Sequence, residues 1–217
     1  MRKAMVFLLL GLTAALSPLP AAAIIQTGHF ATDAEMLAIL SDSLFVAEGR
    51  IGDRGGAATF ELDLGQTTAA PAVQAQYPWQ NGLAEPFSLT YNAGTRLVTF
   101  SLGGRTLTYV TEFRDFGVIY VRTRAVDVGA SVSVGNLILD GSALGDASVA
   151  VLPGGLDILW ITGGAFDAGF TLTGVATLNW GAIIPSQSRL AFQIKVARLN
   201  VVAGETDSWG DVKGLYR

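Results

Sequence analysis

The segment from Phe87 to Val110 constrains the fold of this chain more than any other part of the sequence. Apolar and hydroxyl side chains alternate along it, which is the period of a β-strand with one buried and one solvated face. Gly103-Gly104 is a two-residue turn signal, because glycine reaches positive φ without a Cβ clash. Asn92-Ala93-Gly94-Thr95 suits a four-residue turn. The segment is therefore predicted to be a three-stranded antiparallel meander.

The two turns determine the predicted pairing of these strands. Closing the second hairpin at Gly103-Gly104 places Phe100 opposite Leu107, and closing the first at residues 92–95 places Phe87 opposite Phe100. Both pairings put the same residues on one face, whereas a slip by one residue would scatter them. The predicted core face holds Phe87, Leu89, Val98, Phe100, Leu107 and Tyr109. The predicted outer face holds Ser88, Thr90, Thr99, Ser101, Thr106 and Thr108, with Leu97 as its apolar exception.

Strand-like runs recur along the rest of the chain, separated by turns rich in glycine and aspartate. Thr32-Asp33-Ala34-Glu35 has the spacing of a capping box and predicts one short N-terminal helix. The stretch from Gln66 to Pro78 is predicted to be a surface loop. The expected strands are Leu44–Ile51, Ala58–Leu64, Val118–Val126, Val132–Leu139, Leu156–Thr162, Phe170–Leu178 and Leu190–Leu199. This pattern predicts an all-β fold, a single antiparallel β-sandwich of jelly-roll or lectin-like type.

The first 23 residues have the pattern of a secretory signal peptide. A basic Met1-Arg2-Lys3 head precedes an apolar run, and Ala21-Ala22-Ala23 offers the small residues that signal peptidase requires, so we expect cleavage after Ala23. The run is shorter than the roughly 20 residues that span a bilayer, which argues against an uncleaved anchor. The predicted organisation is a signal peptide (1–23), a sandwich domain (24–200) and a C-terminal tail (201–217). The predicted location is the cell surface or the extracellular medium, with no membrane span in the mature chain.

Composition narrows the classes of function. Cleavage would leave 12 basic residues (14 less Arg2 and Lys3) against 18 acidic ones, a net charge of −6. Without a basic patch, nucleic acid and anionic membrane are unsuitable partners. Cysteine is absent and His29 is the single histidine, which excludes thiol catalysis and most transition-metal sites.

Glu61-Leu62-Asp63-Leu64 is the most suggestive tetrapeptide for chemistry, because both acids share one face of a strand. Laminarinase-type glycosidases begin their catalytic strand with a similar E-x-D pattern. Retaining hydrolysis needs a second carboxylate about 5 Å away, and Gly65 and Gln66 stand where the family has its further glutamate. We therefore interpret these acids as the solvent-facing side of a half-buried strand.

Other polar and aromatic residues have structural interpretations too. His29 is interpreted as a flexible surface residue, and no Gly-x-Ser-x-Gly elbow supports a hydrolase triad. Arg122 and Arg124 share a strand face and are expected to be solvated or bridged to a neighbouring acid rather than to clamp a ligand. Calcium could find oxygen ligands at the turn acids Asp53, Asp140, Asp146 and Asp167, although no calcium-loop motif contains them. Trp160 is expected in the core, while Trp79 and Trp209 are expected to be exposed. The sequence thus assigns no catalytic, cofactor-binding or metal-binding residue.

Several segments, taken in order, resemble the bacterial choice-of-anchor surface domains, most closely the W type, which is associated with PEP-CTERM sorting. The resemblance covers roughly Leu44 to Val196. It rests on FVAEGRIG from Phe45, WQNG from Trp79, the meander, RTRA from Arg122, NLILDG from Asn136, LWI from Leu159, GF at Gly169 and AFQIKV from Ala191. Val201–Arg217 lacks the apolar segment, Pro-Glu-Pro motif and terminal arginines of such anchors, so either the mature protein is released or the sequence stops short of its anchor.

The expected function follows from the leader and from this resemblance. The resemblance implies an exported, non-enzymatic β-sandwich protein of the cell surface or extracellular matrix, with no catalytic residues or cofactor to carry over. The alternative is a carbohydrate-binding module, with exposed Trp79 or Trp209 as the residue that stacks on a sugar. Extracellular polysaccharide or matrix components are the expected partners.

Overall fold

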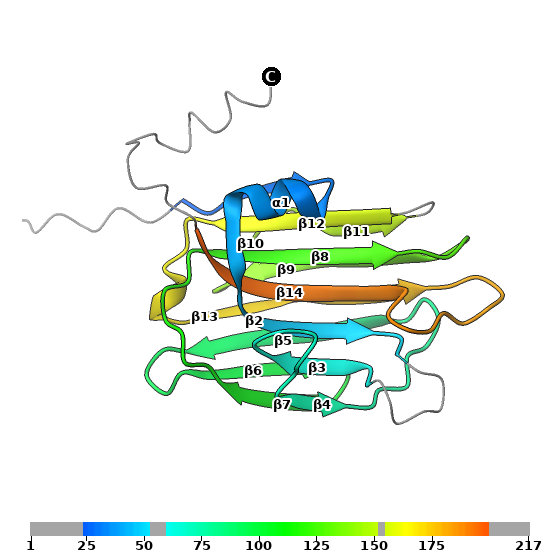
Figure 1. The fold of residues 1–217 in the computed structure, drawn as a ribbon, viewed down its shortest axis with the longest axis horizontal. Helices are drawn as coiled ribbons and strands as arrows, with labels where there is room; N and C mark the ends of the chain where they lie inside the picture. Colours follow the sequence, from blue (N-terminus) through cyan, green and yellow to red (C-terminus); the bar gives the residue numbers. More distant parts are fainter. Residues whose placement is uncertain (1–23, 53–59, 152–154, 200–217) are drawn as a thin grey trace, which may run out of the picture.

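A computed structural model describes residues 24–52, 60–151 and 155–199 of the chain, and these residues form two antiparallel sheets packed face to face (Figure 1). The prediction of an all-β sandwich is confirmed. The predicted signal peptide and C-terminal tail lie outside the described residues. Among the described residues, no helix has the length and apolar character required to cross a bilayer.

The first sheet has seven strands and forms the front layer of Figure 1. Its central strand β14 has the bounds predicted from the sequence, and β2 extends the predicted run at its N-terminal end. In spatial order the strands are β1 (Gln26–Phe30), β12 (Gly155–Thr162), β8 (Val118–Ala125), β14 (Leu190–Leu199), β2 (Leu40–Arg50), β3 (Leu62–Gly65) and β4 (Val73–Ala75).

The second sheet lies behind the first. Its strands in order are β10 (Ser142–Ala143), β9 (Ser131–Leu139), β13 (Phe170–Asn179), β5 (Ala84–Asn92), β6 (Leu97–Leu102) and β7 (Arg105–Val110), with β11 (Ser148–Val151) also paired to β9. A short 3-10 helix, η1 (Phe166–Ala168), precedes β13. Strands β11 and β12 are in contact, as are β4 and β7, so the two sheets meet along both sides of the sandwich.

The predicted meander is present as β5, β6 and β7, with one correction to its register. The second hairpin pairs Phe100 with Leu107 as predicted, and both turn glycines have positive φ. In the first hairpin Phe87 lies opposite Leu102, not Phe100. The turn is displaced because the Asn92 side chain accepts a hydrogen bond from the Thr95 amide and Arg96 takes positive φ, so Asn92 still pairs with Leu97. The two-residue shift leaves every side chain on its predicted face.

The main core lies between the two sheets. Five of the six predicted core residues of the meander are buried, and Tyr109 packs half-buried against them. Phe45 and Phe192 of the first sheet meet Phe87 and Tyr91 of the second through tilted aromatic contacts. Burial of such rings is the main contribution to the stability of a domain without disulfides.

A smaller core lies on the outer face of the first sheet, beneath helix α1 (Asp33–Ile39). The predicted capping box is formed: the Glu35 amide donates to Thr32 Oγ1 at 3.1 Å, and Glu35 Oε2 accepts from the Thr32 amide at 3.3 Å. Met36 of the helix and Phe30 of β1 are buried against Tyr120 of β8. Helix α1 therefore packs on residues of β8 and β12, and Figure 1 shows it at the β12 side of the sheet.

Four short strands were not predicted, and one of them is the two-residue strand β10. The strand β1 precedes the predicted helix, β11 follows a glycine-rich turn, and β4 lies inside the stretch 66–78 that was predicted to be a loop. Each has five residues or fewer and pairs at the edge of a sheet. Strand β1 pairs with β12, far along the chain, whereas β4 and β11 pair with the nearby strands β3 and β9. Runs this short carry too little alternation to be recognised as strands from the sequence.

Candidate functional site

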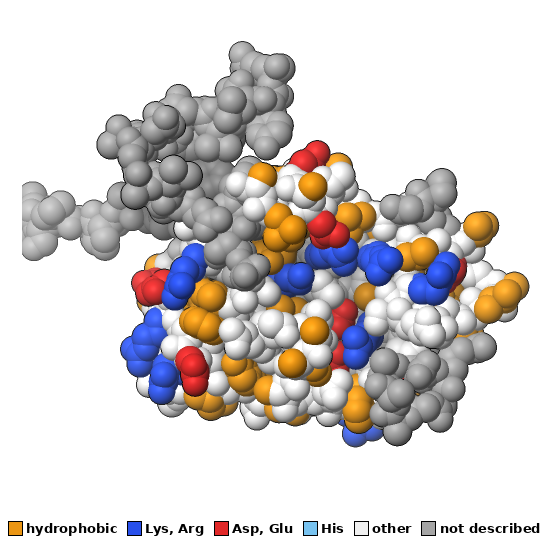
Figure 2. Space-filling view, viewed as in Figure 1, with side chains coloured by type: hydrophobic (Ala, Val, Ile, Leu, Met, Phe, Trp, Pro, Cys, Tyr) orange, Lys and Arg blue, Asp and Glu red, His pale blue; other side chains and the backbone are white. Residues whose placement is uncertain are grey.

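A row of polar side chains crosses the outer face of the first sheet on five neighbouring strands. The register places its members directly opposite one another. The members of this polar row are Gln74 on β4, Asp63 on β3, Glu48 on β2, Gln193 on β14 and Arg122 on β8. Figure 2 shows basic and acidic side chains gathered across the middle of this face.

The two acids of the polar row are buried, with 2% of each residue exposed. Arg50 lies between them, with Nη2 at 2.5 Å from Asp63 Oδ2 and Nη1 at 3.2 Å from Glu48 Oε2. Gln193 donates to Glu48 Oε1 and Gln74 donates to Asp63 Oδ1, each at 2.8 Å. The acids are thus held by one guanidinium and two amides.

Burial shifts the titration of this cluster. It raises the pKa of Glu48 and that of Asp63, and it lowers the pKa of Lys195, which lies close to Arg122. The Glu48 and Asp63 residues also lie directly opposite each other on β2 and β3. The Arg50 guanidinium pairs with both acids and offsets part of their negative charge, and such pairing is the condition under which burial of charged groups is tolerated.

The interpretation of Asp63 as a solvent-facing acid was wrong. Glu61 does remain partly exposed, and it accepts a hydrogen bond from the Tyr77 amide at 3.2 Å. The carboxyl group that faces Asp63 comes from Glu48 on the neighbouring strand, and a search for E-x-D-x-x-E along one strand misses it. The signal that was available is the pair of polar residues Glu48-x-Arg50 within an apolar strand. Glu48 and Asp63 are buried and both pair with Arg50, so a sugar has no access to them. We therefore interpret the two acids as members of structural ion pairs.

Arg122 ends the polar row beneath helix α1. Its Nε and Nη2 each donate to a different oxygen of Asp33 at 2.7 Å, and these bonds lower the pKa of that carboxyl group. Arg122 is thus bridged to a neighbouring acid, as expected from the sequence, while Arg124 lies exposed. The bidentate pair fastens the first turn of α1 to β8.

His29 is exposed at the surface, as expected, but it is held in a strand by two hydrogen bonds instead of lying in a flexible segment. It lies on β1, with Nδ1 at 2.8 Å from Asp157 Oδ1 and Nε2 at 3.1 Å from Asp146 Oδ1. A neutral imidazole has one N–H, so only the imidazolium donates to both carboxylates. Burial alone lowers the pKa of His29, but the two hydrogen bonds outweigh it and the pKa is raised. We call Asp146, His29 and Asp157 the histidine latch.

The histidine latch joins the two sheets at one side of the sandwich. Asp157 lies on β12 of the first sheet and also accepts from the Val149 amide of β11. Asp146 precedes β11 and accepts from the Thr27 hydroxyl at 2.9 Å. The latch therefore holds edge strand β1 against the segment that leads into β11.

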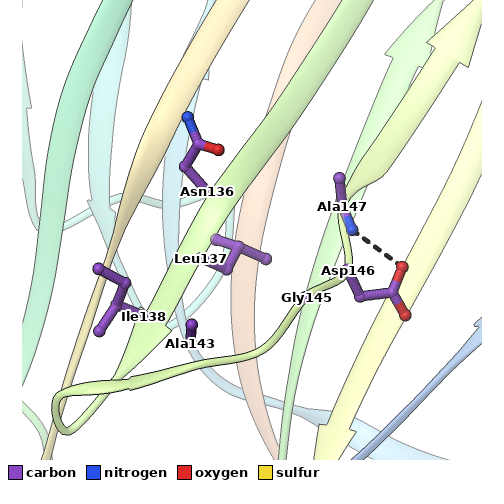
Figure 3. A pocket seen from close by; sticks show the side chains of 7 residues that line it. All are labelled: Asn136, Leu137, Ile138, Ala143, Gly145, Asp146 and Ala147. Atoms are coloured by element: carbon purple, nitrogen blue, oxygen red, sulfur yellow. Dashed lines mark hydrogen bonds between the residues drawn. The ribbon is translucent and has the colours of Figure 1, made fainter.

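A shallow groove of about 700 Å³ lies beside the histidine latch, between β9 and residues 143–147. Leu137 and Ile138 lie on one wall, and Gly145 and Asp146 on the other (Figure 3). The Asp146 carboxylate turns away from the β9 side chains and accepts from the Ala147 amide. Asp146, the acidic residue of this groove, is thus already hydrogen-bonded within the histidine latch. The other residues that line the groove are apolar or neutral.

The predicted tryptophan platform is not formed by Trp79. Its indole Nε1 donates to the Arg50 carbonyl at 2.8 Å, and its ring packs edge-on against Tyr77, half-buried. Trp160 packs against the smaller core rather than the main one. Trp209 lies outside the described residues.

The turn acids considered for calcium are not assembled into one site. Asp140 accepts from the Thr171 amide at 2.7 Å, Asp146 belongs to the histidine latch, and Asp167 is exposed on η1. Asp53 lies outside the described residues. Within the described ranges, no three acidic or histidine side chains are placed to hold a metal ion.

Hydroxyl groups form two straight rows on the outer face of the second sheet. Each of four neighbouring strands contributes a Ser/Thr-x-Ser/Thr pair, and the register aligns the pairs. The first hydroxyl row is Thr171, Thr90, Thr99 and Thr108 on β13, β5, β6 and β7. The second is Thr173, Ser88, Ser101 and Thr106 on the same strands. The meander predicted six of these residues, and β13 adds Thr171 and Thr173.

The fold therefore defines an antiparallel β-sandwich with a charged face, a hydroxyl face and a histidine latch at one side. No known protein-family model matches the chain, and no curated protein matches it.

Proposed function

We propose that this protein is an exported, non-catalytic β-sandwich module of the cell surface or extracellular matrix. The leader pattern at residues 1–23 and the resemblance to choice-of-anchor surface domains support export. The proposal that the module is non-catalytic rests on how its polar side chains are paired. The acids of the polar row, Arg122 and His29 are each engaged in structural ion pairs.

These ion pairs stabilise the sandwich instead of presenting reactive groups. Glu48 and Asp63 are buried beside Arg50, and the nitrogens of His29 are both occupied by carboxylates. General acid–base chemistry needs a group within hydrogen-bond reach of the substrate. A matrix module needs a stable core and an outer surface that can contact other matrix components. The core between the two sheets and the hydroxyl rows on the second sheet support this function.

Export is tested by expressing the full chain in a bacterial host and separating cytoplasm, envelope and medium. We expect the product in the envelope or medium, with an N-terminal sequence that begins at Ile24. A variant with Ala21 and Ala23 changed to Leu should keep the uncleaved mass, because signal peptidase needs small residues there. Full-length protein confined to the cytoplasm would contradict the proposal.

The non-catalytic part is tested by a hydrolysis screen of neutral and acidic polysaccharides. The matched variant is Glu61→Gln, because Glu61 is the partly exposed acid of the E-x-D pattern. We expect no turnover by either protein. Turnover by the wild type that Glu61→Gln abolishes would establish a glycosidase and overturn the proposal.

A carbohydrate-binding module is the second candidate, and the hydroxyl face favours it. Trp79 does not supply the stacking surface that was expected, so recognition through this face would depend on hydrogen bonds. Export and carbohydrate binding are measured in separate experiments, so a negative result for one proposal leaves the other standing.

A further inference from the structure

The outer face of the second sheet combines regular spacing with the absence of charge. At the outward positions of β13, β5, β6 and β7, all of which the structure describes, every side chain is uncharged. The outer face of the first sheet, in contrast, carries the polar row and the basic side chains visible in Figure 2. Exposed faces of soluble domains usually mix both charges, so the neutral face is a specific feature of this chain.

The hydroxyl rows have a fixed geometry. Neighbouring strands are about 4.8 Å apart, so each row of four residues extends over roughly 14 Å across the sheet. The two rows are two residues apart along each strand, which is about 7 Å. The outward hydroxyl groups therefore repeat in two directions. A polymer with a repeating unit can contact several of them at once.

The hydroxyl groups retain bonding capacity for a ligand. Thr90 and Thr171 approach at 3.4 Å, and Ser101 and Thr106 share a hydrogen bond of 3.0 Å. A hydroxyl donates once and accepts twice, so each bonded pair still has free positions. Thr106 and Thr108 are exposed, and the other six are half-buried.

We propose that this hydroxyl face binds an extended, neutral polysaccharide whose chain runs along the two rows, across the strands. This assignment rests on the second candidate function above and names its ligand class and surface. A neutral polymer fits because an acidic polymer would find no cation at these positions. The hydroxyls of its sugars complement those of the rows as both donors and acceptors.

The ligand is a polymer rather than a single sugar for an energetic reason. A hydrogen bond exchanged with water is worth roughly two- to tenfold in affinity, and this face carries no aromatic ring on which a sugar could stack. One sugar that meets two hydroxyls binds weakly. A chain that meets several along a row accumulates measurable affinity.

The test is affinity electrophoresis of the purified protein in gels that contain hydroxyethyl cellulose, dextran or polygalacturonate. We expect retardation by a neutral polymer, none by polygalacturonate, and no competition by glucose. Thr90→Val with Thr99→Val removes two hydroxyls and keeps the side-chain shape, so it should weaken the retardation at least tenfold. The matched control is Thr177→Val, on the same face of β13 but outside both rows, and it should stay within twofold of the wild type.

A second variant keeps the test valid if the valine pair disturbs folding. Thr99→Lys with Thr108→Lys leaves the core untouched and places two charges on the face, and it too should abolish retardation at an unchanged melting temperature. Retardation that survives both variants would overturn the assignment. Binding to polygalacturonate alone, or self-association through this face without any binding to neutral polymer, would overturn it as well. Failure of export would leave this result intact, since binding is measured on purified protein.

Discussion

At the scale of single residues, Arg50 has the largest structural role among the polar side chains. It pairs with both buried acids of the polar row, and its Nε donates to the Phe60 carbonyl at 2.8 Å. Removing one partner of a buried ion pair leaves an uncompensated charge, which costs far more than the intact pair contributes. The polar row therefore depends on a residue that has no role in the E-x-D pattern.

We predict that Arg50→Met lowers the free energy of unfolding by about 3–5 kcal/mol, because Glu48 and Asp63 then lack a cation. Chemical denaturation at pH 7 measures the change. The triple variant with Glu48→Met and Asp63→Leu should recover most of the loss, since an apolar set of similar volume replaces the whole cluster. A loss below 1 kcal/mol for Arg50→Met would show that the acids are neutral without it.

The histidine latch predicts a pH dependence at a single residue. The folded-state pKa of His29 is raised, so its contribution to stability is complete below the unfolded value near 6.5 and is lost as the pH rises through the folded pKa. Hydrogen bonds from His29, Thr27 and Ala147 outweigh burial and lower the pKa of Asp146, whose contribution is lost only below its unfolded value, near pH 4. The latch is therefore strongest between about pH 4 and pH 6.5.

We predict that His29→Gln destabilises the protein more at pH 5.5 than at pH 8.5. The His29 side chain is 39% exposed, so after solvent screening the difference should stay below about 1 kcal/mol. Melting temperatures of both proteins at the two pH values measure it, and the comparison cancels the titration of all other groups. An equal loss at both pH values would mean that His29 is neutral in the folded state.

At the scale of elements, helix α1 shows how a short helix is held in place. Seven residues are too few for a stable helix in water. The capping box satisfies its first amides, Arg122 binds Asp33, and Met36 enters the smaller core. Local hydrogen bonds and tertiary contacts therefore stabilise this short helix together.

We predict that Thr32→Ala costs about 1 kcal/mol, because the Glu35 amide loses its acceptor. Hydrogen exchange should show faster exchange within residues 33–39 and little change in the sheets. Thr32→Ser keeps the hydroxyl acceptor and should behave like the wild type. If alanine and serine give the same exchange rates, packing alone holds α1.

At the scale of the whole molecule, one core joins both sheets and must hold the sandwich together without disulfides. Phe100 belongs to this core and is 1% exposed. We predict that Phe100→Ala lowers the free energy of unfolding by about 3–5 kcal/mol, through lost burial and the cavity left behind. Equilibrium denaturation measures it, with Thr99→Ala on the opposite face expected to cost less than 1 kcal/mol. Similar costs for the two variants would contradict the assignment of the faces.

The alternation of apolar and hydroxyl residues and the turn signals predicted the all-β class, the faces of the meander and the hydroxyl groups of three strands. The capping box was readable because its four residues are contiguous. These features are local: a side-chain period of two and a glycine turn need no distant partner.

Only the tertiary structure decided which strands lie side by side, and hence which polar groups meet. Glu48 and Gln193 are 145 residues apart in sequence, and His29 is 128 residues from Asp157. Their partners were unpredictable because a strand can pair with any other of matching pattern until the packing of both sheets selects one order. The burial of Asp63 has the same explanation. An outward position becomes buried when long side chains from neighbouring strands cover it, and the local sequence does not indicate which strands those are.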